Sequence, residues 1–245
     1  MWLSLGRAPR SGRGGRWFKS SHPDHFLSQK CILKISSPHR GEEIKGNAVI
    51  VNVFLVIFSY LLGSIPTGLV LAKALAGIDP RQGGSRNIGA TNVMRTAGKA
   101  LGAITLIGDV LKGVIPVCLA LFLQRGEWWV AGAGLAAFLG HCFPIYIGFK
   151  GGKGVATALG IYLPLTPLAV LVNIFFFASA VAVSRMVSIG SLIAALAMPL
   201  LIWLGRYPLP YVLMSICVGI IVIYRHKENI KRLIEGKENK LWGQS

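Results

Sequence analysis

The sequence predicts an all-α integral membrane protein with about seven transmembrane helices, its N-terminus outside and its C-terminus in the cytoplasm. Three observations lead to this fold class. The 245-residue chain is 53% hydrophobic and only 14% charged, with a mean hydropathy of +0.59, which is far more apolar than an ordinary globular domain. Apolar stretches long enough to cross the roughly 30 Å hydrocarbon core recur along the chain. Basic residues gather in a few connecting loops, which sets the topology.

The apolar stretches define the expected crossings. We expect six of them near 49–75, 100–123, 128–147, 165–183, 187–204 and 209–224, and a shorter seventh at 155–163. The loop 76–99 carries four basic residues and one acidic residue, so the positive-inside rule places it in the cytoplasm. A single helix over 155–183 would leave the basic C-terminal segment outside, so we expect a reversal at the prolines of YLPLTPL, 162–168. A six-helix count, with 155–183 as one crossing, is the alternative.

The N-terminal segment differs from the rest of the chain. Residues 1–48 carry nine Lys/Arg and three Asp/Glu among many Gly, Ser and Pro, a composition typical of disorder. A basic tail on a membrane surface, a targeting peptide and an over-long gene model are the three interpretations. We favour the gene model, because the topology places the tail outside. The membrane domain is expected at 49–225, and a cytoplasmic motif and tail at 226–245.

Composition argues against several function classes. The four cysteines have no Cys-x-x-Cys or His-paired spacing, so neither a zinc site nor a disulfide framework is supported. The formal charge is +17, but no basic patch interleaved with aromatic residues is typical of nucleic-acid binding. We therefore expect no zinc site and no nucleic-acid partner.

Unusual polar residues cluster at the predicted cytoplasmic ends of the helices. The first cluster is GSIPTG, 63–68, where hydroxyls that bond back to helix carbonyls explain Ser64 when it is taken alone. The second is GGSRNIGATNVMRTAGK, 83–99, which offers the amides of Asn87 and Asn92 and the planar fork of Arg95. A solvated loop would explain the arginines but not the density of glycine and asparagine, so we expect a ligand role.

Two ionisable residues interrupt the second predicted crossing. Asp109 and Lys112 lie three residues apart in GDVLKG, and ionisable groups inside a membrane usually pair and often serve function. A structural ion pair and a substrate contact both stay open here. His141, in GHCFP near the inner end of the next helix, is better explained as a packed neutral histidine.

The stretch FKGGKGVAT, 149–157, is built like a phosphate-binding loop. Its spacing is not that of a nucleotide-binding Walker A motif, because Lys153 is followed by glycine instead of Ser or Thr and the first glycine of the motif is missing. Consecutive backbone N–H groups can still form an anion nest, and the helix that follows adds positive potential. The alternative is a flexible turn with two topology-setting lysines.

The last two clusters lie further along the chain. Ser188 begins a predicted helix in RMVSIGS. His226 and Asn229 share one face of a short basic amphipathic segment after the last crossing, and His226 could titrate near neutral pH.

Taken together, GSIPTG, GSRNIGATNVMRTAGK, DVLKG, GHCFPIYIGFKGGKGVAT, SIGS and HKENIKRLIEGKE resemble the bacterial acyl-phosphate:glycerol-3-phosphate acyltransferases over 50–238. The resemblance implies a seven-helix membrane enzyme that moves a fatty acyl group from acyl phosphate to the sn-1 hydroxyl of glycerol 3-phosphate. The products would be lysophosphatidic acid and phosphate, in the first acylation of phospholipid synthesis. The family uses neither acyl-CoA nor a metal, so the resemblance implies no metal and no other cofactor.

The resemblance also implies the residues of the site. His226 and Asn229 would be catalytic. The residues that bind substrate or phosphate would be Ser64, Ser85, Asn87, Asn92, Arg95, Lys112, Gly151, Gly152, Lys153, Gly154 and Ser188. The general base stays open between His226 and a substrate phosphate. The enzyme would lie in the bacterial inner membrane as a multi-pass protein with its site at the cytoplasmic face. The soluble enzyme that forms acyl phosphate is a candidate partner, and a monomer is compatible with this interpretation.

Two other classes compete with this interpretation. A transporter or channel for a small phosphorylated anion would also place polar residues in helices, although here they gather at one face and no inverted repeat is visible. The acyl-CoA-dependent acyltransferases carry a His-x-x-x-x-Asp motif. In this chain Tyr146 stands five residues after His141, and Lys231 five after His226, so that motif is absent.

Overall fold

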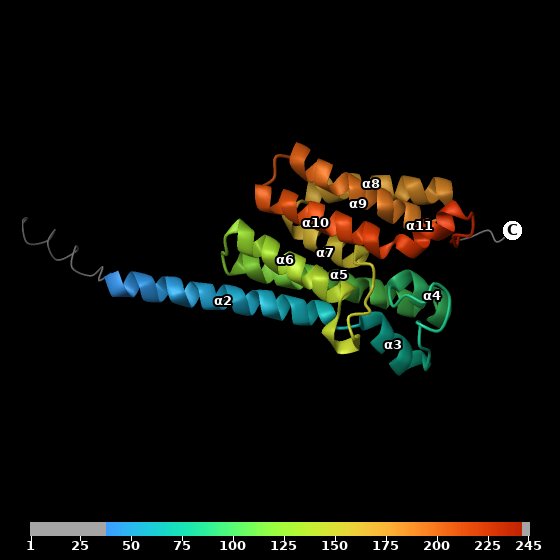
Figure 1. Ribbon diagram of the computed structural model, residues 1–245, viewed down its shortest axis with the longest axis horizontal. Helices are drawn as coiled ribbons and strands as arrows, with labels where there is room; N and C mark the ends of the chain where they lie inside the picture. Colours follow the sequence, from blue (N-terminus) through green and yellow to red (C-terminus); the bar gives the residue numbers. More distant parts are fainter. Residues whose placement is uncertain (1–37, 242–245) are drawn as a thin grey trace, which may run out of the picture. The chain divides into compact units, whose positions relative to one another are not determined.

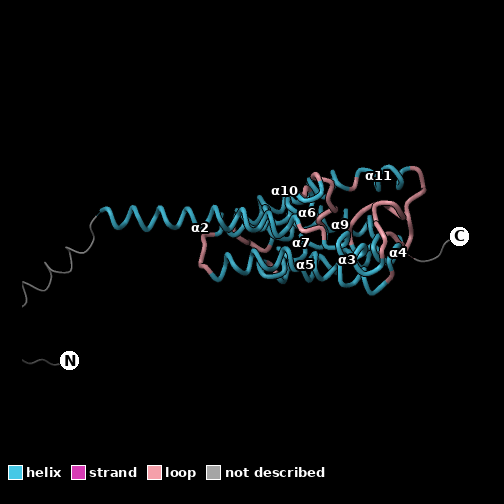
Figure 2. Tube along the Cα trace, turned by 90° about the horizontal axis from the view of Figure 1, so that it is seen from below, coloured by secondary structure: helices cyan, strands magenta, loops and turns pink. Residues whose placement is uncertain are grey.

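The computed structural model describes residues 38–241 (Figures 1 and 2). The chain divides into two units, Met1–Asn47 and Ala48–Ser245, and the second contains all the features discussed below. The disorder expected for 1–48 falls largely outside the described residues, although the backbone is already helical from Pro38. The helices are α2 (Pro38–Ser64), α3 (Thr67–Ala76), α4 (Ala90–Ala97), α5 (Lys99–Phe122), α6 (Glu127–Cys142), the 3₁₀ turn η1 (Ile145–Ile147), α7 (Val155–Leu165), α8 (Pro167–Ser184), α9 (Val187–Leu204), α10 (Leu209–Arg225) and α11 (Lys227–Ile234).

Every regular element of the described residues is helical, which confirms the predicted all-α membrane fold. Five helical segments are long and apolar enough to cross a membrane, and the bent pair of α10 and α11 makes a sixth if it is counted as one span. The five segments are Val49–Ala76, Lys99–Phe122, Glu127–Ile147, Pro167–Ser184 and Val187–Leu204. Helix α7 is apolar but shorter. The total of seven crossings and the sides of the two termini stay predictions.

The predicted reversal in YLPLTPL coincides with a helix break at Thr166. Helix α7 ends at Leu165 and α8 begins at Pro167, so the single helix over 155–183 that the six-helix count required is not formed. Pro167 occupies the first turn of α8, where its missing N–H costs nothing. The N–H of Thr166 donates to the carbonyl of Tyr162 over 2.7 Å, which closes the end of α7.

The first predicted crossing is also broken, between α2 and α3 at Ile65 and Pro66. Proline cannot continue the helix hydrogen-bond ladder, so GSIPTG forms a joint instead of a helical face. Ser64 is fully buried at the end of α2, and its hydroxyl donates back to the carbonyl of Tyr60 over 2.8 Å.

Two glycines let α5 and α7 pack at close range. A Cβ at Gly113 of α5 would overlap the carbonyl of Thr157, and one at Gly160 of α7 would overlap the carbonyl of Val110. Only glycine permits this approach of two backbones, a common device in membrane helix packing. The Thr157 hydroxyl donates to the carbonyl of Asp109 over 3.0 Å, so the start of α7 is held against α5. This contact positions the glycine loop that precedes α7.

Candidate active site

One cavity of about 700 Å³ collects most of the predicted site residues. Its polar lining comes from loops and helix ends, and we call this part the polar mouth. The polar mouth includes Ser85, Asn87, Arg95, Lys153, Ser188, His226, Asn229 and Glu238. Its apolar lining comes from the interiors of α5, α7, α8, α9 and α10, and we call this part the apolar arm. The apolar arm includes Leu106, Tyr162, Val170, Phe177, Met198 and Val218. The cavity therefore has one charged end and one apolar end.

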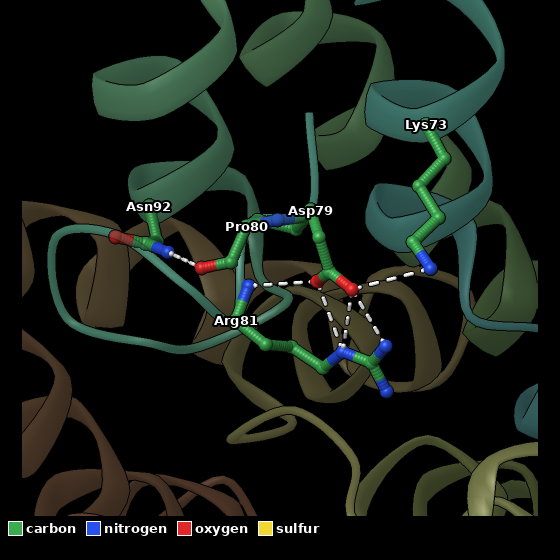
Figure 3. A network of polar contacts seen from close by, with 5 residues as sticks. All are labelled: Lys73, Asp79, Pro80, Arg81 and Asn92. Carbon is green, nitrogen blue, oxygen red and sulfur yellow. Dashed lines mark hydrogen bonds and ion pairs between the residues drawn. The ribbon is translucent and has the colours of Figure 1, made fainter. Parts of the chain in front are cut away.

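The first loop, residues 77–89, is organised by Asn92 of α4 (Figure 3). The amide nitrogen of Asn92 donates to the carbonyls of Pro80 at 2.7 Å, Asn87 at 2.8 Å and Gly83 at 3.2 Å. Its amide oxygen accepts the backbone N–H of Ser85 at 2.8 Å, and the side chain is only 1% exposed. The side-chain amide of Asn92 therefore makes its hydrogen bonds to the loop itself. The loop in turn places Ser85 and Asn87 at the cavity.

A carboxylate ties the same loop to α3. The carboxylate of Asp79 accepts hydrogen bonds from the guanidinium of Arg81 at 2.6 and 2.9 Å and lies 3.2 Å from the ammonium of Lys73 (Figure 3). The hydrogen bonds from Arg81 hold the pKa of Asp79 well below its ordinary value. These side chains face solvent more than Asn92 does, so this anchor is the weaker one.

The glycine loop, residues 149–154, rests on the end of α6. The N–H of Gly152 donates to the carbonyl of His141 at 3.1 Å. A Cβ at Gly152 would overlap the imidazole of His141, and one at Gly151 would overlap its carbonyl oxygen. From another element, the guanidinium of Arg225 donates through Nε to the carbonyl of Gly152 at 3.0 Å and through Nη2 to that of Gly151. Gly151 and Gly152 thus attach the loop to α6 and Arg225, and neither glycine lines the cavity.

Four backbone amides at the end of the glycine loop and the start of α7 belong to residues that line the cavity. The backbone N–H groups of Lys153, Gly154, Val155 and Ala156 have no hydrogen-bond acceptor within the described part of the chain, and all four residues line the cavity. The first helical bond of α7 runs from the N–H of Ala158 to the carbonyl of Gly154 at 2.7 Å. Free N–H groups at a helix start combine with the helix dipole to make an anion site.

A chain of polar contacts links Lys153 to the C-terminal segment. The ammonium of Lys153 donates to the amide oxygen of Asn229, whose nitrogen donates to Glu238 at 2.6 Å. The second carboxylate oxygen of Glu238 accepts Nε of Arg232 at 2.8 Å. Burial lowers the pKa of Lys153 to about 8, with the charge of Glu238 opposing the shift and that of Arg232 adding to it. Lys153 is therefore a cation held ready for an anionic ligand.

His226 lies at the junction of α10 and α11 and is 2% exposed. Its Nδ1 is 2.7 Å from the carbonyl of Val222, which assigns the hydrogen to Nδ1 and leaves the lone pair on Nε2. Burial and then the charge of Lys153 lower the pKa of His226 to about 4, so the ring is neutral at pH 7. Ser188, 5% exposed, has a hydroxyl without a hydrogen-bond partner among the described residues.

Two other predicted residues lie away from the cavity lining. Lys112 is 5% exposed and pairs with Asp109 at 2.8 Å, while Nδ1 of His141 lies 3.6 Å from the same carboxylate oxygen. Asp109 and His141 reach the cavity, and Lys112 does not. Ser64 is likewise outside the lining, and its hydroxyl bonds within α2. Lys112 therefore forms an ion pair, which is one of the two interpretations that the sequence left open.

Two residues of the site escaped sequence reasoning. Glu238 completes the contacts of Asn229, and Arg225 holds the glycine loop. Glu238 stands inside the quoted motif HKENIKRLIEGKE, so its place there was the available signal. Arg225 looked like an ordinary basic residue after a membrane helix. Among residues 38–241 no group of three or more His, Cys, Asp or Glu side chains is arranged to hold a metal ion.

Comparison with known proteins decides the family. A sequence model of glycerol-3-phosphate acyltransferases matches residues 53–236. The glycerol-3-phosphate acyltransferase of Geobacter sulfurreducens is 53% identical over 189 residues, which cover 77% of this chain and 96% of that protein. The chain belongs to the glycerol-3-phosphate acyltransferase family. This membership confirms the family predicted from the motifs and favours an enzyme over the transporter or channel.

Two solved structures of this family share the fold. One is PlsY (YgiH), an integral membrane glycerol 3-phosphate acyltransferase in its glycerol 3-phosphate form, with a TM-score of 0.76 and 43% identity. The other is PlsY in its lysophosphatidic acid form, with a TM-score of 0.72 and 41% identity. Each match covers 78% of this chain and 96% of the solved chain. The fold of this acyltransferase is thus that of an integral membrane enzyme.

Proposed function

We propose that this chain transfers a fatty acyl group from acyl phosphate to the sn-1 hydroxyl of glycerol 3-phosphate and releases lysophosphatidic acid and phosphate. This would be the first step of phospholipid synthesis. The observation that carries the proposal is the single cavity that joins the polar mouth to the apolar arm. One substrate is a small phosphate ester, and the other bears both a phosphate and a long hydrocarbon chain. A cavity with one cationic and one apolar end suits both.

The phosphate groups would bind at the start of α7 and along its rim. Lys153 supplies a charge, the free N–H groups from Lys153 to Ala156 supply a nest, and Arg95 adds a second cation. Ser85, Asn87 and Ser188 would complete the contacts. Lys112, Gly151, Gly152 and Asn92 are assigned indirect roles, because each is engaged with the protein itself. Ser64 is assigned no substrate contact, because its hydroxyl is bonded within α2.

The chemistry needs positioning and charge stabilisation. The acceptor hydroxyl attacks the acyl carbonyl, a new C–O ester bond forms, and the bond from the carbonyl carbon to the phosphate oxygen breaks. Phosphate is a good leaving group, so alignment of the reactants and stabilisation of the developing anions supply most of the catalysis. Asn229 would hold the acceptor.

The hydroxyl proton could pass to Nε2 of His226, whose lone pair is free, or to a substrate phosphate. The pKa of His226 is about 4, so at pH 7 its ring is neutral and is a weaker base than an ordinary histidine. Turnover of His226→Ala close to that of the native enzyme would remove it as the base.

The membrane setting follows from the charge of the loops. We place the enzyme in the bacterial inner membrane with the polar mouth at the cytoplasmic face, because the first loop and the glycine loop carry the basic residues. Glycerol 3-phosphate would then enter from the cytoplasm and the acyl chain from the bilayer. The soluble enzyme that forms acyl phosphate is a candidate partner, and a monomer would suffice for the site described.

Purified protein should be supplied with glycerol 3-phosphate and, in separate reactions, acyl phosphate, acyl-CoA or acyl-carrier protein. Transfer from acyl phosphate alone is the expected result. Transfer from acyl-CoA alone would overturn the proposal, because the site would then use a different leaving group. Liposomes with the same protein and labelled glycerol 3-phosphate provide the control for transport, and no flux is expected.

A further inference from the structure

We propose that Arg225 is a positioning residue that orients the glycine-loop backbone so that the N–H of Lys153 is available to the substrate phosphate. The residue does not line the cavity, and its hydrogen bonds are made to the loop backbone. This inference rests on the proposed role of the glycine loop in phosphate binding. It concerns how the loop obtains its shape, not whether the loop binds phosphate.

The contacts of Arg225 are made to the loop backbone. Its Nε donates to the carbonyl of Gly152 at 3.0 Å, and its Nη2 donates to that of Gly151. The guanidinium also lies 5.5 Å from the centre of the Phe143 ring, just after α6. The planar fork therefore bridges two successive carbonyls while its face rests on an aromatic ring. An ammonium group cannot make both contacts, because it is a point charge on a flexible stem.

Peptide geometry turns these two bonds into a direction for the amides. In a planar trans peptide the carbonyl of one residue and the N–H of the next point to opposite sides. When Arg225 draws the carbonyls of Gly151 and Gly152 towards itself, the N–H groups of Gly152 and Lys153 must point away. The N–H of Gly152 finds the carbonyl of His141 at 3.1 Å. The N–H of Lys153 has no acceptor in the described part of the chain, and Lys153 lines the cavity.

The loop's own sequence contains nothing that would hold this arrangement. Glycines permit many backbone conformations, so an unsupported glycine loop would lose binding energy in becoming ordered. Two supports restrain it, the carbonyl of His141 on one side and the guanidinium of Arg225 on the other. Preorganisation by Arg225 should therefore appear mainly in substrate affinity.

The test compares variants at this position. Arg225→Lys keeps the charge and loses the fork, and Arg225→Ala loses both. Both should raise the KM for a phosphate-bearing substrate by about 10-fold or more, with kcat changed by less than about 3-fold, because ground-state and transition-state binding weaken together. Guanidinium ion added to Arg225→Ala should recover part of the lost affinity. Lys227→Gln, which removes an exposed neighbouring charge, should match the native enzyme.

Several results would overturn the proposal. Native KM values in Arg225→Lys would show that charge alone suffices. A lower melting temperature with native kinetic constants would show a purely structural role, and a loss confined to kcat or no recovery with guanidinium would also contradict it. The separate variant Lys153→Met distinguishes a failure of the proposed phosphate site from a failure of the proposed role of Arg225. If Lys153→Met leaves both KM values unchanged, the proposed phosphate site is wrong. If Lys153→Met weakens binding but Arg225→Lys has native kinetics, only the proposed role of Arg225 is wrong.

Discussion

The first loop and the glycine loop both deliver backbone and side-chain groups to the polar mouth, but they are ordered in different ways. The first loop is held by Asn92, whose most distant partner in the loop is 12 residues away. The glycine loop is held by His141 and by Arg225, which lies 73 and 74 residues from the two carbonyls it contacts. One half of the polar mouth is therefore ordered locally and the other by tertiary packing.

This difference predicts that variants of the first loop mainly change the stability of the protein, whereas variants of the glycine loop mainly change its affinity for substrate. Removing a buried amide that serves four loop groups should damage the fold of the first loop. Altering the glycine loop should leave the membrane helices packed and instead change how phosphate binds.

Lys153→Met should have the largest effect, because it removes the buried charge of the glycine loop. We expect kcat/KM to fall by about 100-fold or more, the scale of a lost charge-assisted contact in a catalytic site. Lys150→Met, an exposed lysine in the same loop, is the matched control and should stay within about 3-fold of the native enzyme. Steady-state acyl transfer measures both. Equal losses in the two variants would mean that the loop contributes only general positive charge.

Asn92→Ala should destabilise the protein, because it leaves buried backbone groups of the first loop without partners. An unsatisfied buried group costs about 1–3 kcal/mol, so the variant should lose roughly 2–4 kcal/mol of stability. Asp79→Ala removes the carboxylate that pairs with the exposed Lys73 and Arg81, and it should cost less than about 1 kcal/mol. Thermal unfolding in detergent compares the two. A similar melting temperature for both would contradict the hierarchy of anchors.

Gly152→Ala should raise the KM for glycerol 3-phosphate by about 10-fold with smaller changes in stability. The new methyl group would overlap the imidazole of His141 and displace the loop, and small displacements in a positioned site are costly. Gly126→Ala introduces the same methyl group where no atom lies within 4 Å, and its kinetics should be unchanged. If both variants keep native KM values, the contact of the loop with His141 does not set its binding shape.

The pH dependence of substrate binding should follow Lys153. Its pKa of about 8 means that the binding cation is fully present below pH 7 and is lost as the pH rises through 8. The KM for a phosphate-bearing substrate should therefore rise several-fold, and at most about 10-fold, between pH 7 and pH 9. Lys153→Arg, which keeps its charge, should flatten this profile even if its affinity is lower. An unchanged profile in that variant would assign the titration to another group.

The sequence was sufficient for the fold class and the family because those depend on patterns that lie within single segments. The apolar windows predicted the long helices, and the prolines at Pro164 and Pro167 indicated the break that the structure places at Thr166. The glycine loop was recognisable because glycine density and a lysine need no partner to be visible. Ser85, Asn87 and Arg95 reached the cavity as expected.

Contacts between distant segments were beyond sequence reasoning. An asparagine that organises a loop looks the same in a sequence as one that binds a ligand, so the internal hydrogen bonds of Asn92 were not anticipated. Ser64 was grouped with the site because the motif does not show that this residue is buried outside the cavity lining. Arg225 gave no signal, since its partners are carbonyls 73 and 74 residues away, and carbonyls carry no sequence information.

The spacing of these contacts also has a consequence for biosynthesis. All four loop groups that Asn92 bonds lie before it in the chain, so the first loop can take its shape as soon as α4 has left the ribosome. The glycine loop must wait for the end of α10, because the guanidinium that holds it is translated 73 residues later. Since proteins fold progressively during synthesis, a nascent chain that has not reached Arg225 holds half of its phosphate site ordered and the other half open. The site is complete only when the segment after α10 has also been made, because His226, Asn229 and Glu238 lie beyond the end of that helix.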